Sequence, residues 1–68
     1  MLPTLNMRYI ISHEFGMNYD KYVYRTWPTI QWTDDKMLAL RMHPDIASGI
    51  SLRLMEMGMS HSITQIKD

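Results

Sequence analysis

Histidine is the side chain in this sequence best suited to metal binding or acid–base chemistry. It occurs three times, at His13, His43 and His61, with gaps of 30 and 18 residues. These spacings match no common metal-ligand motif, and the chain has no cysteine to complete a zinc site. We therefore predict that the protein has no metal site, and nothing else in the sequence implies a cofactor.

Two short segments contain groups that enzymes use, but each has a simpler explanation. Ser60, His61 and Ser62 are adjacent, whereas a nucleophile and its base rarely reach each other from neighbouring positions, and no glycine elbow surrounds either serine. Asp34 and Asp35 form a pair of carboxylates, which the dipole at the start of a helix accounts for. A chain of 68 residues also has little volume for a substrate pocket of about 300 Å³ or more. We predict that the protein is not an enzyme and has no catalytic residues.

Composition favours a binding surface. Seven basic and seven acidic residues give a net charge of zero, so total charge alone indicates neither a nucleic-acid-binding protein nor an acidic DNA mimic. Eight methionines, four tyrosines and two tryptophans are many for so small a core, and these side chains suit contact surfaces. Methionine as a filler of the core is the alternative explanation.

The chain is expected to form a single domain over residues 1–68. Residues 1–6 contain a proline and no hydrophobic periodicity, so we expect this end to be frayed. The first residues lack the basic start and apolar run of a signal peptide, and no stretch approaches the ~20 apolar residues of a membrane helix. We therefore expect a cytoplasmic protein that does not bind membranes.

Two segments in the first half have the period-two pattern of β-strands. Apolar and polar residues alternate from Met7 to Phe15, and a β-branched and aromatic run extends from Tyr22 to Trp27 and stops at Pro28. Residues 16–20 carry three turn-favouring residues. We expect an antiparallel hairpin, which must pack on a helix because an isolated hairpin is marginal in water.

The second half has two helix signals. Thr33 is a good N-cap, acids follow it, and Trp32 can pack on Met37, so a helix is predicted from Thr33 to about Met42. Pro44 then opens a second helix, over residues 44–58. Residues 63–66 form an optional third strand. The predicted fold is α+β, with the hairpin and this optional strand packed on two helices in the order β-β-α-α-β.

The helix at 44–58 has two apolar stripes. One contains Ile46, Ala47, Ile50, Leu54 and Met57, and the other contains Leu52, Met55 and Met59. The first stripe is predicted to face the core, and the second needs either a sheet of the same chain or a second copy of the protein. A short chain without disulfides gains from oligomerisation. We therefore predict a homodimer through the second stripe, with Tyr22 and Tyr24 of the hairpin added.

The hairpin also supports an alternative function. Basic and aromatic side chains alternate there, in the pattern of a platform on which single-stranded nucleic acid stacks. The residues are Arg8, Lys21 and Arg25 with Tyr9, Tyr22, Tyr24 and Trp27. Three cations are few for such a platform, so we place this function second.

Three local patterns resemble a known family. They are the alternating tyrosines of Lys21–Tyr24, the hydroxyl and acid of Thr33–Asp34, and the Ile-Ser-Leu-Arg-Leu run of residues 50–54. With the size of the chain and its lack of cysteine, they resemble the small dimeric uracil-DNA glycosylase inhibitors of Bacillus phages. After the helix cap that family has an aromatic, an acid and a tyrosine, where this chain has Asp35, Lys36 and Ala39.

The resemblance implies a function and a contact surface. The protein would be a phage-encoded, non-enzymatic module that binds a host protein, uracil-DNA glycosylase, in the bacterial cytoplasm and occupies its DNA-binding groove. The acids would stand where DNA phosphates lie, and apolar neighbours would meet an apolar feature of the groove. The partner-binding residues would be Trp32, Asp34, Asp35, Met37 and Leu38. Helix capping by the two acids remains the competing explanation.

Overall fold

The structure is a computed structural model, and it describes residues 7–14 and 20–67. Four antiparallel strands form one sheet in the order β3-β2-β1-β4. The strands are β1 (Met7–Glu14), β2 (Asp20–Arg25), β3 (Gln31–Thr33) and β4 (Ser62–Lys67). The predicted frayed segment 1–6 and residues 16–19 of the predicted loop 16–20 lie outside the described residues, whereas Asp20, assigned to that loop from sequence, is the first residue of β2.

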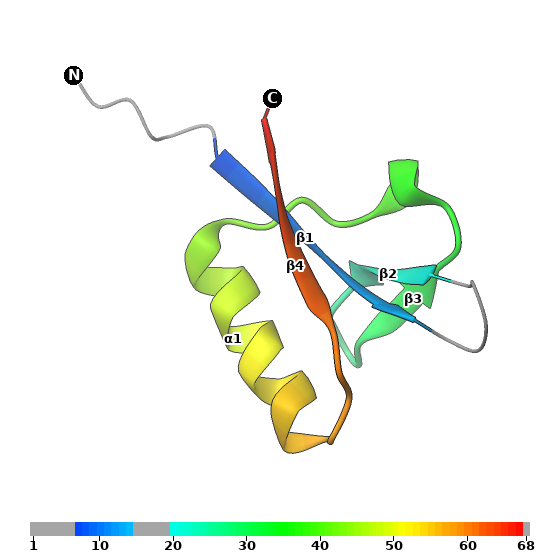
Figure 1. Ribbon diagram of the computed structural model, residues 1–68, viewed down its shortest axis with the longest axis vertical. Coiled ribbons are helices and arrows are strands. Elements are labelled where there is room, and N and C mark those ends of the chain that lie inside the picture. The colour runs from blue at the N-terminus through cyan, green and yellow to red at the C-terminus, as the bar shows by residue number, and fades with distance from the viewer. Residues whose placement is uncertain (1–6, 15–19, 68) are drawn as a thin grey trace.

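The described residues contain one α-helix, α1 (Pro44–Glu56), and one short 3-10 turn, η2 (Lys36–Leu38). The element order is therefore β-β-β-η-α-β, and Figure 1 shows α1 lying alongside β1 and β4. The predicted fold of two helices packed on a hairpin is wrong. The helix predicted from Thr33 is absent, and a further strand, β3, ends at Thr33. The optional strand near the C-terminus is present as β4, which pairs with β1.

The predicted helix from Thr33 to Met42 fails because its residues have other backbone partners. Trp32 and Thr33 pair with Val23 and Tyr22 in the sheet. The backbone of Leu40 donates to the carbonyl of Val23 at 2.8 Å. A ten-residue helix is marginal by itself, so hydrogen bonds to the existing strands prevail.

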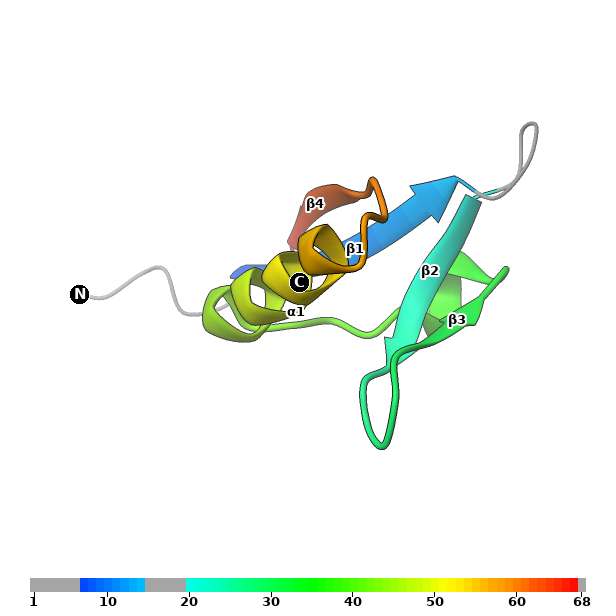
Figure 2. The same cartoon turned by 90° about the horizontal axis from the view of Figure 1, so that it is seen from below.

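Strand β1 is the centre of the sheet. It pairs with β2 from Ser12 to Glu14 and with β4 from Met7 to Ser12. β2 does not pair with the first half of β1. The segment before α1 pairs there instead, and Tyr9 and Met42 exchange two backbone hydrogen bonds of 2.8 Å. Figure 2 shows β2 and β3 at the right, at the end of the sheet away from α1.

The core lies between α1 and the sheet. Its buried residues are Ile11, Val23, Met42, Ala47, Ile50 and Leu54, and partly buried Tyr9, Ile30, Trp32, Leu40 and Met59 pack against them. Three of the five residues of the first predicted stripe of α1, namely Ala47, Ile50 and Leu54, therefore face the core as predicted.

Two members of that first stripe do not face the core. Ile46 and Met57 are 54% and 61% exposed. They lie at one border of the apolar arc, where the sheet does not cover the helix.

Residues that favour helix termini lie at both ends of α1. The ring of His43 accepts a hydrogen bond from the backbone of Asp45, and Pro44 occupies the first turn. The helix ends at Glu56, and Gly58 follows with a positive φ of 76°. Among the described residues, no helix is long and apolar enough to span a membrane.

Candidate functional site

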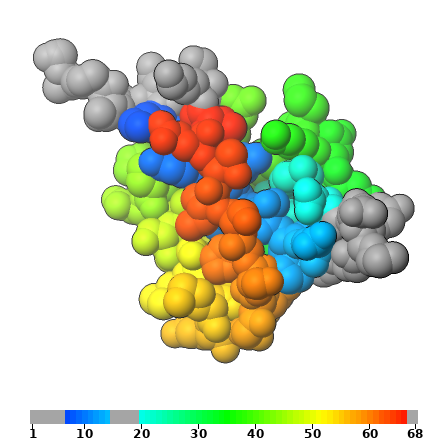
Figure 3. Space-filling model, viewed as in Figure 1, coloured from blue at the N-terminus to red at the C-terminus, as the bar shows by residue number. Residues whose placement is uncertain are grey.

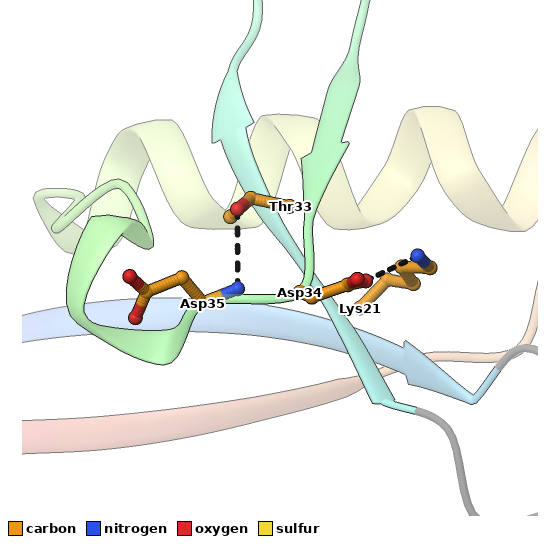
Figure 4. A network of polar contacts seen from close by, with 4 residues as sticks. All are labelled: Lys21, Thr33, Asp34 and Asp35. Atoms are coloured by element: carbon orange, nitrogen blue, oxygen red, sulfur yellow. Dashed lines mark hydrogen bonds and ion pairs between the residues drawn. The ribbon is translucent and has the colours of Figure 1, made fainter.

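The segment after β3 is held by short-range polar contacts (Figure 4). The hydroxyl of Thr33 accepts a hydrogen bond from the backbone N–H of Asp35 at 3.1 Å. Asp35 in turn accepts from the backbone N–H of Met37 at 2.9 Å and so caps η2. Asp34 forms an ion pair with Lys21 of β2. These contacts fix a sharp turn, in which no residue of η2 itself is buried.

The turn presents two large apolar side chains to solvent. Met37 is 84% exposed and Leu38 is 60% exposed, and Asp34 and Asp35 beside them are exposed as well. Figure 1 shows η2 projecting away from the sheet at the upper right. We call residues 34–38 the η2 knob.

Four of the five predicted partner-binding residues lie on this knob, and Trp32 does not. It belongs to β3, is half-buried and packs against the core. Its ring centre lies 5.8 Å from that of His13, with the rings tilted by 52°. The side chain of Trp32 therefore packs toward the core and His13 and does not belong to the knob.

The knob is less acidic than its two aspartates suggest. Lys21 contacts the carboxylate of Asp34, which is 63% exposed, so this pair is nearly neutral to a distant partner. Lys36 follows Asp35 directly. The distinctive property of the knob is thus its exposed apolar pair, with one carboxylate, that of Asp35, beside it.

The five residues predicted to form a dimer interface lie on different surfaces. Leu52 and Met55 on α1 are 56% and 65% exposed, whereas Met59 packs against the core. Tyr22 and Tyr24 are half-buried on β2, which β1 separates from β4. One flat interface cannot contain all five.

The histidine at position 61 makes a contact that the sequence did not reveal. The hydroxyl of Ser51 donates to Nε2 of His61 at 2.6 Å, and Nδ1–H of His61 donates to the carbonyl of Met59 at 3.1 Å, which is the tautomer that satisfies both contacts. Ser51 lies on α1 and His61 lies ten residues later, just before β4, so no local spacing could have indicated the pair.

This pair has the contact of a nucleophile with its base, but its surroundings do not suit catalysis. A polar cavity of about 270 Å³ lies beside His61, and Ser51 does not line it. Its lining residues are Ser12, His13, Glu14, Asp20, Ser60, His61 and Ser62. A nucleophile must reach the bound substrate, so we assign the Ser51–His61 pair to holding α1 against the start of β4.

The other two histidines also make structural contacts. Nδ1 of His13 contacts the carbonyl of Ser60, and His43 caps α1. Among the described residues, no group of three or more histidine, cysteine or acidic side chains is placed to hold a metal ion.

No protein-family model, curated protein or solved structure matches this chain. The surface of the chain itself is therefore the basis for inferring function.

Proposed function

We propose that the protein is a non-enzymatic protein-binding module whose contact surface is the η2 knob. The observation that carries this proposal is the exposure of Met37 and Leu38 together on one projecting turn. Exposed apolar residues on a rigid turn bury their surface when a partner covers them, and such anchors provide most of the affinity of an interface. The turn is already ordered by its caps, so binding has little ordering cost.

The partner we propose is a host enzyme with a basic DNA-binding groove, and the protein would be a phage-encoded inhibitor that occupies this groove. The resemblance in the sequence makes uracil-DNA glycosylase the first enzyme to test. Exposed Asp35 would face the cations of the groove at short range, because charges further than about 8 to 10 Å are screened at physiological salt. The knob would supply the apolar anchor that a DNA strand lacks.

The apolar anchor is tested by replacing Met37 and Leu38 with serine. Both side chains are exposed, so the melting temperature should change little. Removing two anchors should weaken inhibition of uracil excision at least tenfold. The matched control is Met57→Ser, which removes another exposed methionine just after the last residue of α1 and should leave inhibition unchanged.

Either of two results would contradict this function. Wild-type protein that neither binds nor inhibits the glycosylase would exclude that partner. Equal inhibition by the wild type and the double variant would exclude the knob as the contact.

The charge is tested with Asp35→Asn. Asparagine still caps a helical turn, so the fold should be preserved while the carboxylate is lost. We expect weaker inhibition and a smaller dependence of the association rate on salt, measured by stopped-flow fluorescence. Asp34→Asn is the less direct variant because it also breaks the ion pair with Lys21. An unchanged salt dependence in Asp35→Asn would eliminate the electrostatic role.

One observation favours binding to single-stranded nucleic acid as the second candidate. Trp27 is 80% exposed, and the guanidinium of neighbouring Arg25 lies 5.6 Å from the ring centre of Tyr24. Tyr9 packs against the core instead, so the predicted platform is reduced to one end of β2. Filter binding at low and high salt separates the two functions, because a platform must bind single-stranded DNA and must weaken with salt.

A further inference from the structure

Strand β4 lies at the end of the sheet, and among the described strands it pairs with β1 alone. Half of the backbone N–H and C=O groups of such a strand point away from the sheet and can pair with another strand. Figure 3 shows β4, in red and orange, on the face toward the viewer with α1 beside it. We propose that this edge pairs antiparallel with β4 of a second copy of the chain, so that the two sheets become one.

The exposed edge lacks the usual protection against such pairing. Soluble proteins commonly blunt an edge strand with charged residues, proline or a bulge. Residues 62–66 of β4 contain no charge and no proline, and the pairing of β4 with β1 is regular from Met7↔Lys67 to Ser12↔Ser62. The apolar Ile63 is 45% exposed on this strand. The edge is therefore suited to pairing.

Symmetry fixes which residues can face each other. Antiparallel pairing of two identical strands uses a two-fold axis perpendicular to the sheet. The corresponding faces of the two sheets then lie on the same side of the combined sheet. A residue can then face only a residue an even number of positions away. Centring the pairing on Thr64 uses all of residues 62–66, places Thr64 opposite its own copy and keeps Lys67 outside the contact. Opposed threonines are a favourable cross-strand pair.

The flank of α1 next to β4 extends this contact. Ser48 lines an apolar groove with Ile63, and Ser51 bonds to His61 just before β4, so these residues mark the side of the helix nearest the edge. Leu52 and Met55 lie on the same side at helical spacing and are more than half exposed. The two-fold axis brings both helices to the same face of the combined sheet.

A stable dimer requires both the strand edge and the flank of α1. A stable interface buries about 800 Å² of accessible surface on each partner, out of the 5031 Å² that this chain exposes. One short strand edge does not supply this area, so the uncharged flank of α1 must contribute. A second copy fits because residues 62–66 are uncharged and an antiparallel edge can pair with its own copy, while Leu52 and Met55 offer exposed apolar area beside it; a charged partner would find no countercharge on residues 62–66. The proposal does not depend on the function of the η2 knob.

The test uses the absence of cysteine from the sequence. In Thr64→Cys, the two thiols would lie on directly opposed residues, whose Cα atoms are about 4.5 to 5.5 Å apart, within the range of a disulfide. We expect mild oxidation to convert the protein to a covalent dimer of twice 8.1 kDa. The matched control, Thr29→Cys, places an exposed cysteine in the turn between β2 and β3 and should cross-link only slowly.

A second variant tests the contact without chemistry. Thr64→Lys places two ammonium groups opposite each other on the axis and should convert a dimer to a monomer in analytical ultracentrifugation, whereas Thr64→Val should remain dimeric. Circular dichroism checks that both variants retain the fold. The proposal is overturned by wild-type protein that sediments as a monomer at 100 micromolar, or by equal cross-linking rates in the two cysteine variants.

Discussion

At the scale of single residues, the contact between Ser51 and His61 links α1 to the residue that precedes β4. The serine projects from the third turn of α1, and the histidine precedes β4 and also donates to the carbonyl of Met59 beyond the helix end. One imidazole therefore connects the helix, its C-terminal turn and the edge strand. Both side chains are half-buried, so loss of either partner leaves a polar group poorly solvated.

This role is tested by comparing Ser51→Ala with Ser48→Ala. Both substitutions give α1 a better helix former, by up to about 0.5 kcal/mol. Only Ser51→Ala removes the hydrogen bond to His61, at a net cost of about 1 kcal/mol, which corresponds to roughly 4–8 °C in a domain of this size. Thermal unfolding of Ser51→Ala should thus begin several degrees below that of Ser48→Ala. Equal melting temperatures would show that the contact contributes nothing to stability.

At the scale of elements, the end of α1 depends on one glycine. Gly58 has φ +76°, in the left-handed region that side chains with a Cβ atom avoid. The backbone N–H groups of Gly58 and Met59 then close the helix by donating to the carbonyls of Met55 and Leu54 at 3.0 and 2.9 Å. This turn reverses the chain toward His61 and β4.

The two helix-region glycines should respond to alanine in opposite directions. Gly58→Ala should destabilise the protein by about 1 to 2 kcal/mol, because alanine is strained at positive φ. Gly49→Ala should stabilise it by about 0.5 to 1 kcal/mol, because the position is helical and a Cβ atom there meets nothing within 4 Å. Urea unfolding measures both changes. Stabilisation by Gly58→Ala would show that this turn is not required.

The elements that the sequence predicts correctly are those with local signals. Alternation predicted strands over residues 7–15 and 22–27, where the structure has β1 at 7–14 and β2 at 20–25, and Pro44 with the apolar arc behind it predicted α1. The helix expected from Thr33 was wrong because the competing hydrogen bonds come from β1 and β2, which are distant in sequence. A capping signal cannot report that competition.

Candidate sites were likewise predicted only where a local signal marks them. The exposed residues of the η2 knob were selected from sequence, although the predicted helix that led to them is absent, because Asp35 caps a 3-10 turn in its place. Ser51 with His61 and the edge of β4 were not foreseen. Both depend on the order of strands in the sheet, for which no short segment carries a signal.

At the scale of the whole molecule, the protein has a small core for its length. Among the described residues eight hydrophobic side chains are buried, whereas Trp27, Met37, Leu52 and Met55 are each more than half exposed. Chains of this size gain only a few kcal/mol from their own core and usually need a further source of stability. The chain has no cysteine, so disulfides cannot supply it, and we propose association of two copies through β4 as this source.

Association that stabilises the folded chain must make its melting temperature depend on concentration. If unfolding separates the dimer, a total unfolding enthalpy of roughly 95 kcal/mol, from about 0.7 kcal/mol per residue over two chains, gives a rise of about 5 °C for each tenfold increase in protein. Differential scanning calorimetry from 10 to 1000 micromolar should therefore show a rise of about 10 °C for the wild type. Thr64→Lys should melt at a constant, lower temperature over the same range, and Thr64→Val should follow the wild type. A wild-type melting temperature that does not change with concentration would mean that the edge of β4 contributes nothing to stability, and that the monomer is held together by its core alone.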